Sequence, residues 1–569
     1  MMKIELPDAY KGMKFDKLFS IYFGYFSVEM LLPAFFFLVE SKGRHRLKMP
    51  NAEKIDEYIS ALQHHPRLEG FTDEDGKRIL EKWAKTSLIV IGKKGRLKQE
   101  QSEQILHLQP LSYLTFKAGF PSKLSRLENV HSFLYQLMIN TLKKECDDEL
   151  QANNAIRSAL RTAFADGVMD LPDVPGKDIN GKYDGKTELD TETLLSILFM
   201  DSFEPAKIGR RKVKYAETPV CEGQAQRFMH GFIKLITIFK DRMPARELIY
   251  NLQTLINFEL CIYTLKLIHG TNRLVEKREI PSQYSVDTMP TKPQLYADLT
   301  HQPKGLSLEI ARQCVSRDLQ ELSRFFTSLL QLRVLDRFVS DEPDFKEDIS
   351  GLSSQQYLLT LLELADNPQL QGSANFLIRE IKKLNEESQN NDSNIELKQF
   401  FERNDNFKKG DSIARLVNIL DEAQRGRIGS QIFGWFRGVG GVDKDYGFIK
   451  GSKHRRTWAY SMSDDLLWTL VHLASVHPDE IEKDNNAQEP KPLRLVEFLD
   501  FLENRYGVMI HKVPDGMASI EANRAARENL VALQIRLRQM GLFENLSDDF
   551  EAQYITPQYR EISSINPQH

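Results

Sequence analysis

Helical periodicity dominates the pattern of hydrophobic and polar positions along this 569-residue chain. Apolar residues recur at spacings of three and four between Phe133 and Leu142, which predicts an amphipathic helix. The stretch from Pro244 to His269 is apolar almost all round, as expected of a helix buried within a bundle. A further helix is predicted from Asp318 to Val339, with Asp341-Glu342-Pro343 after its end. The fold class that this pattern predicts is mainly α.

The last stretch, residues 442–569, has a different pattern, in which short β-prone pieces alternate with amphipathic helices. Phe448-Ile449 and Thr457 to Tyr460 flank a basic turn, which predicts a hairpin. Three helices are predicted to follow it: one with Ser463 as its N-cap, one from about Leu493 to Tyr506 that stops at Gly507, and one from about Ser519 to Met540 that stops at Gly541.

A polar turn at 547–549 and the β-prone Tyr554-Ile555-Thr556 come after the third of these helices. Helices followed by a polar turn and a strand resemble a winged helix, in which the last helix and the wing bind DNA or a protein partner. We therefore expect residues 442–569 to form a C-terminal winged-helix-like (α+β) module. The third helix is its candidate recognition helix.

Chain length and turn-rich segments predict a multi-domain helical protein, because one hydrophobic core stops growing at roughly 250–300 residues. Pro, Gly, Asn and Asp collect at 172–190, 281–305, 385–410 and 483–492, which are candidate linkers. We predict an N-terminal helical domain at residues 1–171, a central helical scaffold domain at 191–440 and the winged-helix-like module at 442–569. The glycine-rich run from Gly434 to Gly441 is predicted to be a flexible turn or hinge before that module.

Composition and charge limit the classes of protein to which this chain can belong. Hydrophobic residues make up 41% and charged residues 27%, which is typical of a folded globular protein. A formal net charge of −4 gives no global attraction to nucleic acid, so any such contact must come from local basic patches. The four cysteines form no C-x-x-C pair, and no secretory signal pattern is present at the N-terminus. We expect a cytoplasmic protein.

The segment from Leu18 to Val39 is apolar for long enough to span a bilayer. Glu29 lies near its middle, where a carboxylate costs about 2.5–3.5 kcal/mol on insertion scales. The segment is also rich in Phe and Tyr, as a core helix can be. Buried core is therefore favoured over membrane association, and both readings stay open at this stage.

Three basic clusters are the candidate nucleic-acid contacts. Basic residues hold phosphates, and aromatic neighbours such as Trp458 and Tyr460 can stack on bases. Arginines on the predicted recognition helix add to the first cluster. A solvated face is the ordinary alternative for each cluster alone, whereas convergence of all three would indicate a groove that follows phosphates. The clusters consist of Lys450, Lys453, His454, Arg455 and Arg456 with Arg524 and Arg527; of Arg210, Arg211, Lys212 and Lys214; and of Lys42, Arg44, His45, Arg46 and Lys48.

No motif identifies a reaction. The run from Gly434 to Gly441 lacks the Lys and Ser/Thr of a phosphate-binding loop, and no G-x-S-x-G is present. No metal site and no cofactor are predicted from histidine or cysteine spacing. Glu396, Glu402 and Asp405 could belong to a dispersed nuclease site, but they form no recognisable nuclease pattern. The sequence leaves open whether the chain is an enzyme and favours a non-enzymatic protein.

Three C-terminal segments carry a family resemblance: RTWAYSMSDDLL at 456–467, LVEFLDFLENRYGVMI at 495–510 and LRQMGLFENLSDDFEAQYITPQY at 537–559. They resemble accessory proteins encoded in bacterial anti-phage operons. The resemblance is to the methylation-associated or phosphorothioation-dependent defence type, in which such a protein accompanies a large ATPase. It covers about the last quarter of the chain and includes no catalytic motif.

That resemblance implies a non-enzymatic subunit of a bacterial anti-phage defence complex. We expect the helical part to scaffold partner subunits, an ATPase among them, and the C-terminal module to contact DNA or another subunit. A divergent metal-dependent nuclease of a defence or restriction system and a purely structural protein-docking subunit are the two alternatives. Membrane association is not expected.

Overall fold

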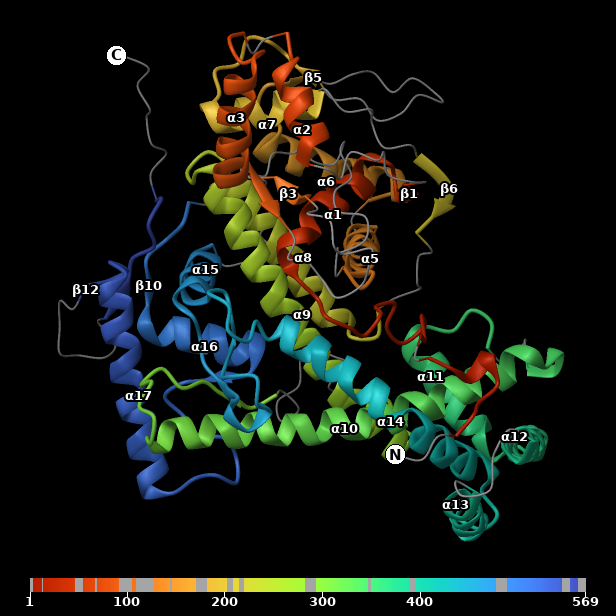
Figure 1. Cartoon of the computed structure of the whole chain (residues 1–569). Coiled ribbons are helices and arrows are strands. Elements are labelled where there is room, and N and C mark those ends of the chain that lie inside the picture. Colours follow the sequence, from red (N-terminus) through yellow and green to blue (C-terminus); the bar gives the residue numbers. More distant parts are fainter. Residues whose placement is uncertain are drawn as a thin grey trace.

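Long helices build most of the protein, and its strands are short (Figure 1). A computed structural model describes residues 4–12, 14–46, 55–66, 69–91, 105–108, 127–143, 146–169, 182–201, 208–213, 219–281, 293–345, 349–387, 394–476, 489–544 and 553–560. The predicted mainly α class is confirmed. The buried apolar side chains form one continuous cluster that extends from Ile4 to Ile555. The predicted domain boundaries stay predictions.

Two long helices form the axis of the fold. Helix α9 (Ala245–Lys277) begins directly after Pro244 and is buried on nearly all sides, as its apolar pattern predicts. Helix α10 (Leu306–Asp341) begins after Gly305, a full three turns before the predicted start at Asp318. The two helices pack against each other, and the remaining elements cover them.

The N-terminal elements lie above this axis in the view of Figure 1, except η1, which lies against α10 and α14. Helix α5 is buried around almost its whole circumference, so the prediction of an amphipathic helix there is wrong in that respect: α1, α6 and α8 all pack against it. These elements are η1 (Asp8–Tyr10), η2 (Val28–Met30), α1 (Leu31–Glu40), β1 (Arg44–Arg46), α2 (Ile55–Gln63), α3 (Glu74–Trp83), η3 (Ala84–Leu88), β2 (Ile89–Ile91), β3 (Ile105–Leu108), α5 (Val130–Leu142), α6 (Glu149–Phe164), β4 (Val168–Met169), β5 (Lys182–Tyr183), α7 (Thr191–Asp201), β6 (Ile208–Lys212) and α8 (Glu222–Phe239).

Most of the apolar segment 18–39 lies in the protein core, although Tyr22 and Tyr25 are exposed. Leu18, Phe19 and every residue from Leu31 to Val39 are buried. Within the described parts of the chain, no helix combines the length and apolarity needed to span a membrane. Glu29, the carboxylate inside the segment, is accommodated by Lys444, whose Nζ lies 2.8 Å from Glu29 Oε1.

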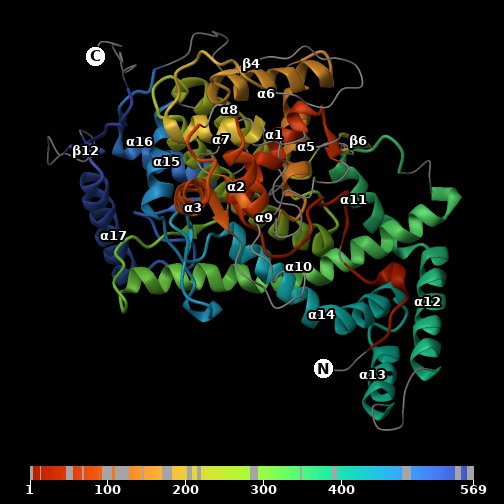
Figure 2. The same ribbon diagram turned by 45° about the horizontal axis from the view of Figure 1, so that its top comes forward.

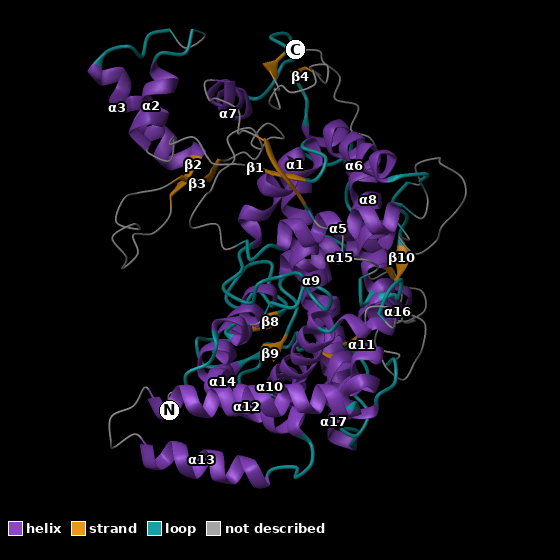
Figure 3. Ribbon diagram, turned by 90° about the vertical axis from the view of Figure 1, so that its right-hand side faces the viewer, coloured by secondary structure: helices purple, strands orange, loops and turns teal. Residues whose placement is uncertain are grey.

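The elements after α10 gather at one end of the axis, opposite the C-terminal helices (Figure 2). Helix α14 packs along α10, and α12 packs on α14. Figure 3 shows α12 and α13 at the end of the molecule away from α2 and α3. These elements are η6 (Pro343–Phe345), α11 (Ser354–Glu363), η7 (Leu364–Asp366), α12 (Pro368–Glu387), α13 (Asn394–Asn406) and α14 (Ser412–Val439).

The predicted hinge at Gly434–Gly441 is wrong, because most of this run belongs to the last turns of α14. A Cβ on Gly438 would lie 2.9 Å from the backbone oxygen of Phe26, and one on Gly440 would lie 2.5 Å from Ile449 Cδ1. These glycines permit close packing against the N-terminal segment and the following strand. Only Gly441, with φ of 61°, uses the backbone freedom from which the hinge was inferred.

The C-terminal elements show the predicted helices with their predicted ends. The side chains of Ser463 and Ser519 accept hydrogen bonds from the backbone N–H of Leu466 and Ala522, and Gly507 ends its helix with φ of 71°. These elements are β8 (Ile449–Lys450), η8 (Arg455–Thr457), β9 (Ala459–Tyr460), α15 (Asp464–Ser475), β10 (Leu493–Arg494), α16 (Leu495–Tyr506), β11 (Val508–Met509), α17 (Ile520–Gln539), β12 (Phe543–Glu544) and β13 (Tyr554–Ile555), and they are joined by β7 (Leu295–Tyr296), which precedes α10 in the chain.

Short strand pairs and buried polar contacts join the C-terminal elements to the helical axis. Strand β11 pairs in parallel with β7, and β13 lies between β10 and β12 in an antiparallel sheet. The side-chain amide of Asn529 on α17 donates to the carbonyl oxygens of Ala297 and Ile510 and accepts from the N–H of Leu299. The C-terminal elements are therefore fixed to the rest of the described fold.

Candidate nucleic-acid interface

The predicted basic hairpin is confirmed. Strands β8 and β9 pair antiparallel, with Ile449 opposite Tyr460 and Lys450 opposite Ala459. The five basic residues of the first cluster, Lys450, Lys453, His454, Arg455 and Arg456, are all exposed on this hairpin. None of the five forms an ion pair with any residue in the described part of the chain. The hairpin therefore presents uncompensated positive charge to solvent.

The hairpin is held in one conformation by contacts at its base. Trp458 Nε1 donates to the carbonyl oxygen of Ser452 at 2.9 Å, and Thr457 Oγ1 donates to that of His454 at 2.8 Å. The guanidinium of Arg455 lies 3.9 Å from the centroid of the Phe433 ring on α14, a cation–π contact. These contacts hold the backbone of the turn and the side chain of Arg455 in place.

Base stacking by Trp458 and Tyr460 is excluded by their burial. Trp458 is 3% exposed and Tyr460 is fully buried. Tyr460 instead donates a hydrogen bond from its hydroxyl to Asp318 Oδ2 at 2.7 Å, inside the core. The prediction that these aromatics lie beside the cations as stacking platforms is therefore wrong. Tyr460 anchors the hairpin to α10, and Trp458 packs on Phe436 of α14.

The arginines of the predicted recognition helix, α17, are divided between solvent and internal contacts. Arg527 is exposed, and exposed Arg524 pairs with Glu528 at 3.2 Å. The guanidinium of Arg536 donates hydrogen bonds to the Asp464 carboxylate and to the carbonyl oxygen of Met462. The same helix also exposes three aliphatic side chains, Ile520, Val531 and Ile535.

The second and third basic clusters come together in the structure. Strand β6, which carries Arg210, Arg211 and Lys212, pairs antiparallel with β1, and Lys212 lies opposite Arg44. Lys214 and Lys48 lie outside the described residues. The first cluster does not join them: its hairpin packs on α10, whereas β1 and β6 lie beside α1 and α5 (Figures 1 and 3). Two of the three clusters therefore converge.

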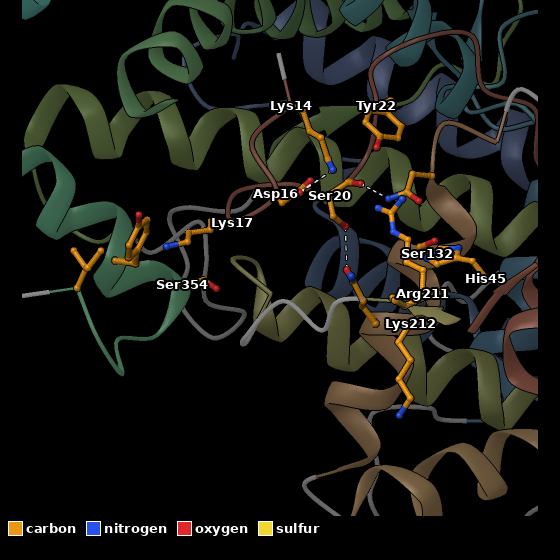
Figure 4. A pocket seen from close by; sticks show the side chains of 15 residues that line it. Lys14, Asp16, Lys17, Ser20, Tyr22, His45, Ser132, Arg211, Lys212 and Ser354 are labelled. Atoms are coloured by element: carbon orange, nitrogen blue, oxygen red, sulfur yellow. Dashed lines mark hydrogen bonds and ion pairs between the residues drawn. The ribbon is translucent and has the colours of Figure 1, made fainter. Parts of the chain in front are cut away.

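Sequence reasoning missed a cavity of about 360 Å³ beside β1 and β6. The N-terminal segment supplies Lys14 and Lys17 to its wall, α5 supplies Ser132, and the first turn of α11 supplies Ser354 (Figure 4). The signal in the sequence was the regular spacing of lysines at positions 11, 14 and 17, but it does not show what those lysines face.

Of the three carboxylates considered for a nuclease site, Asp405 is ion-paired, whereas Glu396 and Glu402 are exposed on α13. Asp405 pairs with Lys382 and Arg415, both at 2.7–2.8 Å, and Cys221 is fully buried, which raises the pKa of its thiol to about 12. Across the described ranges, no three His, Cys, Asp or Glu side chains gather where they could hold a metal ion. The four cysteines are free thiols.

Comparison with known proteins decides the family. Residues 8–559 match the family model described as methylation-associated defense system protein MAD7. The chain belongs to this family. No curated protein and no solved structure matches the chain. The MAD7 match extends far beyond the C-terminal quarter from which a defence-operon accessory protein was inferred, and it selects the methylation-associated type. MAD7 membership supports a role in a methylation-associated defence system.

Proposed function

We propose that this MAD7 family member is a non-enzymatic subunit of its defence complex that contacts DNA phosphates through the β8–β9 hairpin. The observation that carries the proposal is the set of five exposed basic residues on the hairpin, none of them ion-paired within the described chain. Clustered cations without acidic neighbours bind a phosphate backbone by releasing its counterions. Such binding is local and needs no positive net charge on the whole protein.

The hairpin favours contact with the DNA backbone over readout of bases. Its aromatic residues are buried, so no stacking platform accompanies the cations. Its position is fixed by the contact between Arg455 and Phe433. A cluster of cations without stacking groups supports positioning of DNA through its phosphates. Discrimination between DNA sequences would then belong to another subunit.

We infer that residues 442–569 include a winged helix. Its support is the order of α15, β10, α16, α17, β12 and β13, which is the helix–strand–helix–helix–strand–strand order of that fold. The order β10-β13-β12 within the sheet also agrees. Helix α17 would be the recognition helix, with Arg524 and Arg527 on its exposed side.

The exposed side of α17 supports docking of a protein partner. Ile520, Val531 and Ile535 are 86%, 51% and 47% exposed and recur at helical spacing. Exposed aliphatic residues next to Arg524 and Arg527 suit another defence subunit with an apolar, acidic surface better than they suit DNA. We propose the ATPase of the defence system as this partner. We also propose that the complex is cytoplasmic.

The proposal is tested by measuring the affinity of the purified chain for duplex DNA. The test variant replaces the four permanently charged hairpin residues Lys450, Lys453, Arg455 and Arg456 with Ala. A matched control replaces four exposed cations of α13 and the turn after it, so that net charge changes equally; these are Lys398, Arg403, Lys408 and Lys409. The hairpin variant should bind at least tenfold more weakly in low salt, and the control variant should bind like the unmodified chain.

The alternatives give different results. A purely structural docking subunit would show no DNA affinity in any form. A divergent nuclease would cut DNA in the presence of a divalent metal ion, and substitution of clustered carboxylates would abolish cutting while leaving binding intact. Equal loss of affinity in the hairpin and control variants would contradict a specific role of the hairpin.

A further inference from the structure

The cavity beside β1 and β6 is strongly positive. Four cationic side chains line it, Lys14, Lys17, Arg211 and Lys212, against a single carboxylate, Asp16. Asp16 Oδ2 lies 2.8 Å from Lys14 Nζ, so that carboxylate is already paired. Arg211 and Lys212 are exposed on β6 and form no ion pair within the described chain. The cavity therefore has excess positive charge that an anion could neutralise.

Two lining residues are held in place by their neighbours. Arg44 pairs with Lys212 and Arg46 with Ile208, so β6 has two extra residues opposite His45, and such a bulge re-aims the side chains of β6 within it, Arg211 among them. Burial and the nearby Arg211 lower the pKa of His45, so its imidazole is neutral at pH 7 and can serve as a hydrogen-bond donor or acceptor. Lys17 Nζ lies 3.4 Å from the centroid of the Tyr357 ring, which positions this ammonium group at the wall.

A buried hydroxyl without a partner points to a ligand. Ser132 on α5 lines the cavity, is 2% exposed, and its Oγ forms no hydrogen bond within the described structure. Buried hydroxyls are normally hydrogen-bonded, because an unsatisfied one costs on the order of 1–3 kcal/mol. In Figure 4, Ser132 lies next to His45 and Arg211, so a ligand oxygen bound to Arg211 is within the neighbourhood of this hydroxyl.

The far wall adds a second feature that suits an anion. Ser354 and Tyr357 come from the first turn of α11, whose N-cap is Ser353. The amino end of a helix carries partial positive charge and favours phosphate groups. Tyr22, Tyr357, Val213 and Ile349 supply apolar and aromatic surface beside the cations. Phosphate-binding groups and an apolar wall within one cavity match the two ends of a nucleotide.

We propose that this cavity binds a nucleoside phosphate monoester, with the phosphate on Arg211 and Ser132 and the nucleoside against the tyrosines. A volume of about 360 Å³ lies within the range of small-molecule sites, roughly 300–1,000 Å³. A free nucleotide and a 5′-phosphorylated DNA end are the two sources of such a phosphate monoester. The site is separate from the hairpin and does not depend on the proposed function.

The test is calorimetric titration of the full chain with each of the four 2′-deoxynucleoside 5′-monophosphates. The matching nucleosides without phosphate serve as ligand controls. A second arm compares a ten-nucleotide single strand with a 5′-phosphate against the same strand with a 5′-hydroxyl. The variants are Arg211→Gln and Ser132→Ala. Arg210→Gln is the matched control, because Arg210 is exposed on the same strand and does not line the cavity.

We expect saturable binding of at least one monophosphate or of the 5′-phosphorylated strand, and no binding of the form that lacks phosphate. Loss of one charge-assisted hydrogen bond in Arg211→Gln should weaken binding roughly tenfold to a hundredfold. Ser132→Ala should weaken it less, and Arg210→Gln should leave it within about twofold. The first arm identifies a free nucleotide and the second a DNA end.

The inference is overturned if no phosphate monoester binds, if the nucleosides bind equally well, or if Arg211→Gln and Arg210→Gln have the same effect. The variant with Ala at Lys450, Lys453, Arg455 and Arg456 should retain full nucleotide binding. Failure of the hairpin in DNA binding is thereby distinguished from failure of the cavity.

Discussion

Replacement of Glu29 by Gln tests how the buried N-terminal segment is attached to the rest of the fold. Glu29 Oε1 accepts hydrogen bonds from Lys444 Nζ at 2.8 Å and from the Tyr446 hydroxyl at 3.0 Å, and Ser27 Oγ donates to its other oxygen. Burial raises the pKa of Glu29, but the hydrogen bonds and charge of Lys444, together with Ser27, outweigh it and lower the pKa to about 2.

The size of the effect follows from that pKa. Relative to the usual value of 4.5, a pKa of about 2 corresponds to roughly 3 kcal/mol of stabilisation of the ionised form. This is an upper limit, because the Glu29 side chain is 28% exposed and Lys444 is 49% exposed, so water screens the pair. We expect Glu29→Gln to lower the free energy of unfolding at pH 7 by about 1–3 kcal/mol.

The lowered pKa also determines how the stabilisation by Glu29 changes with pH. Because the pKa is lowered in the folded state, the stabilisation is fully present above pH 4.5 and is lost as the pH falls from 4.5 toward 2. Urea unfolding followed by tryptophan fluorescence at pH 7, 5.5 and 3.5 measures it. The midpoint of Glu29→Gln should lie below that of the unmodified chain at pH 7 and 5.5, and the gap should narrow at pH 3.5.

Asp8→Asn is the control for this experiment. Asp8 pairs with Lys11 at 2.6 Å, but its side chain is 95% exposed, so its replacement should leave the midpoint unchanged. Equal midpoints for Glu29→Gln and the unmodified chain at pH 7, or a gap that widens at pH 3.5, would refute the reasoning.

Three further predictions concern buried groups. Arg505→Met removes the guanidinium that lies 3.7 Å from the buried Glu259 carboxylate and should lower the free energy of unfolding by about 3–5 kcal/mol in urea titrations; a loss below 1 kcal/mol would contradict this. Gly438→Val forces a side chain against Phe26 and should cost about 1–3 kcal/mol, so an unchanged melting temperature would count against the close packing. Burial lowers the pKa of His472 to about 4, so between pH 6.5 and 4 the unfolded chain binds a proton at this histidine that the folded chain does not. The free energy of unfolding is therefore unaffected by His472 above pH 6.5 and declines as the pH falls toward 4. His472→Gln should flatten the stability profile over that interval, and an unaltered profile would exclude this group as its source.

Local signals predicted the helix ends of the C-terminal elements well. Ser463 and Ser519 are N-caps whose side chains satisfy free backbone N–H groups, and Gly507 adopts the left-handed conformation that ends a helix. These features depend on a few neighbouring residues, so they can be read from the sequence. The burial of α9 was also predictable from the sequence, because the helix is apolar on nearly every face.

Features that depend on tertiary packing were not predictable in the same way. The glycines near Gly438 permit close contact with Phe26, which is distant in sequence, and nothing local distinguishes that role from a hinge. Trp458 and Tyr460 follow a basic run, but their burial is set by α10 and α14. The cavity needs side chains from five separate segments, and only the pairing of β1 with β6 brings Arg211 to it.

The salt dependence of DNA binding tests the central claim most directly. The logarithm of the association constant is plotted against the logarithm of salt concentration for the unmodified chain and for the variant with Lys450, Lys453, Arg455 and Arg456 replaced by Ala. Each phosphate contact contributes roughly 0.7–0.9 to the magnitude of the slope, so this magnitude should be smaller by about 3 in the variant. A slope near zero in the unmodified chain, or the same slope in both proteins, would contradict DNA contact through the hairpin.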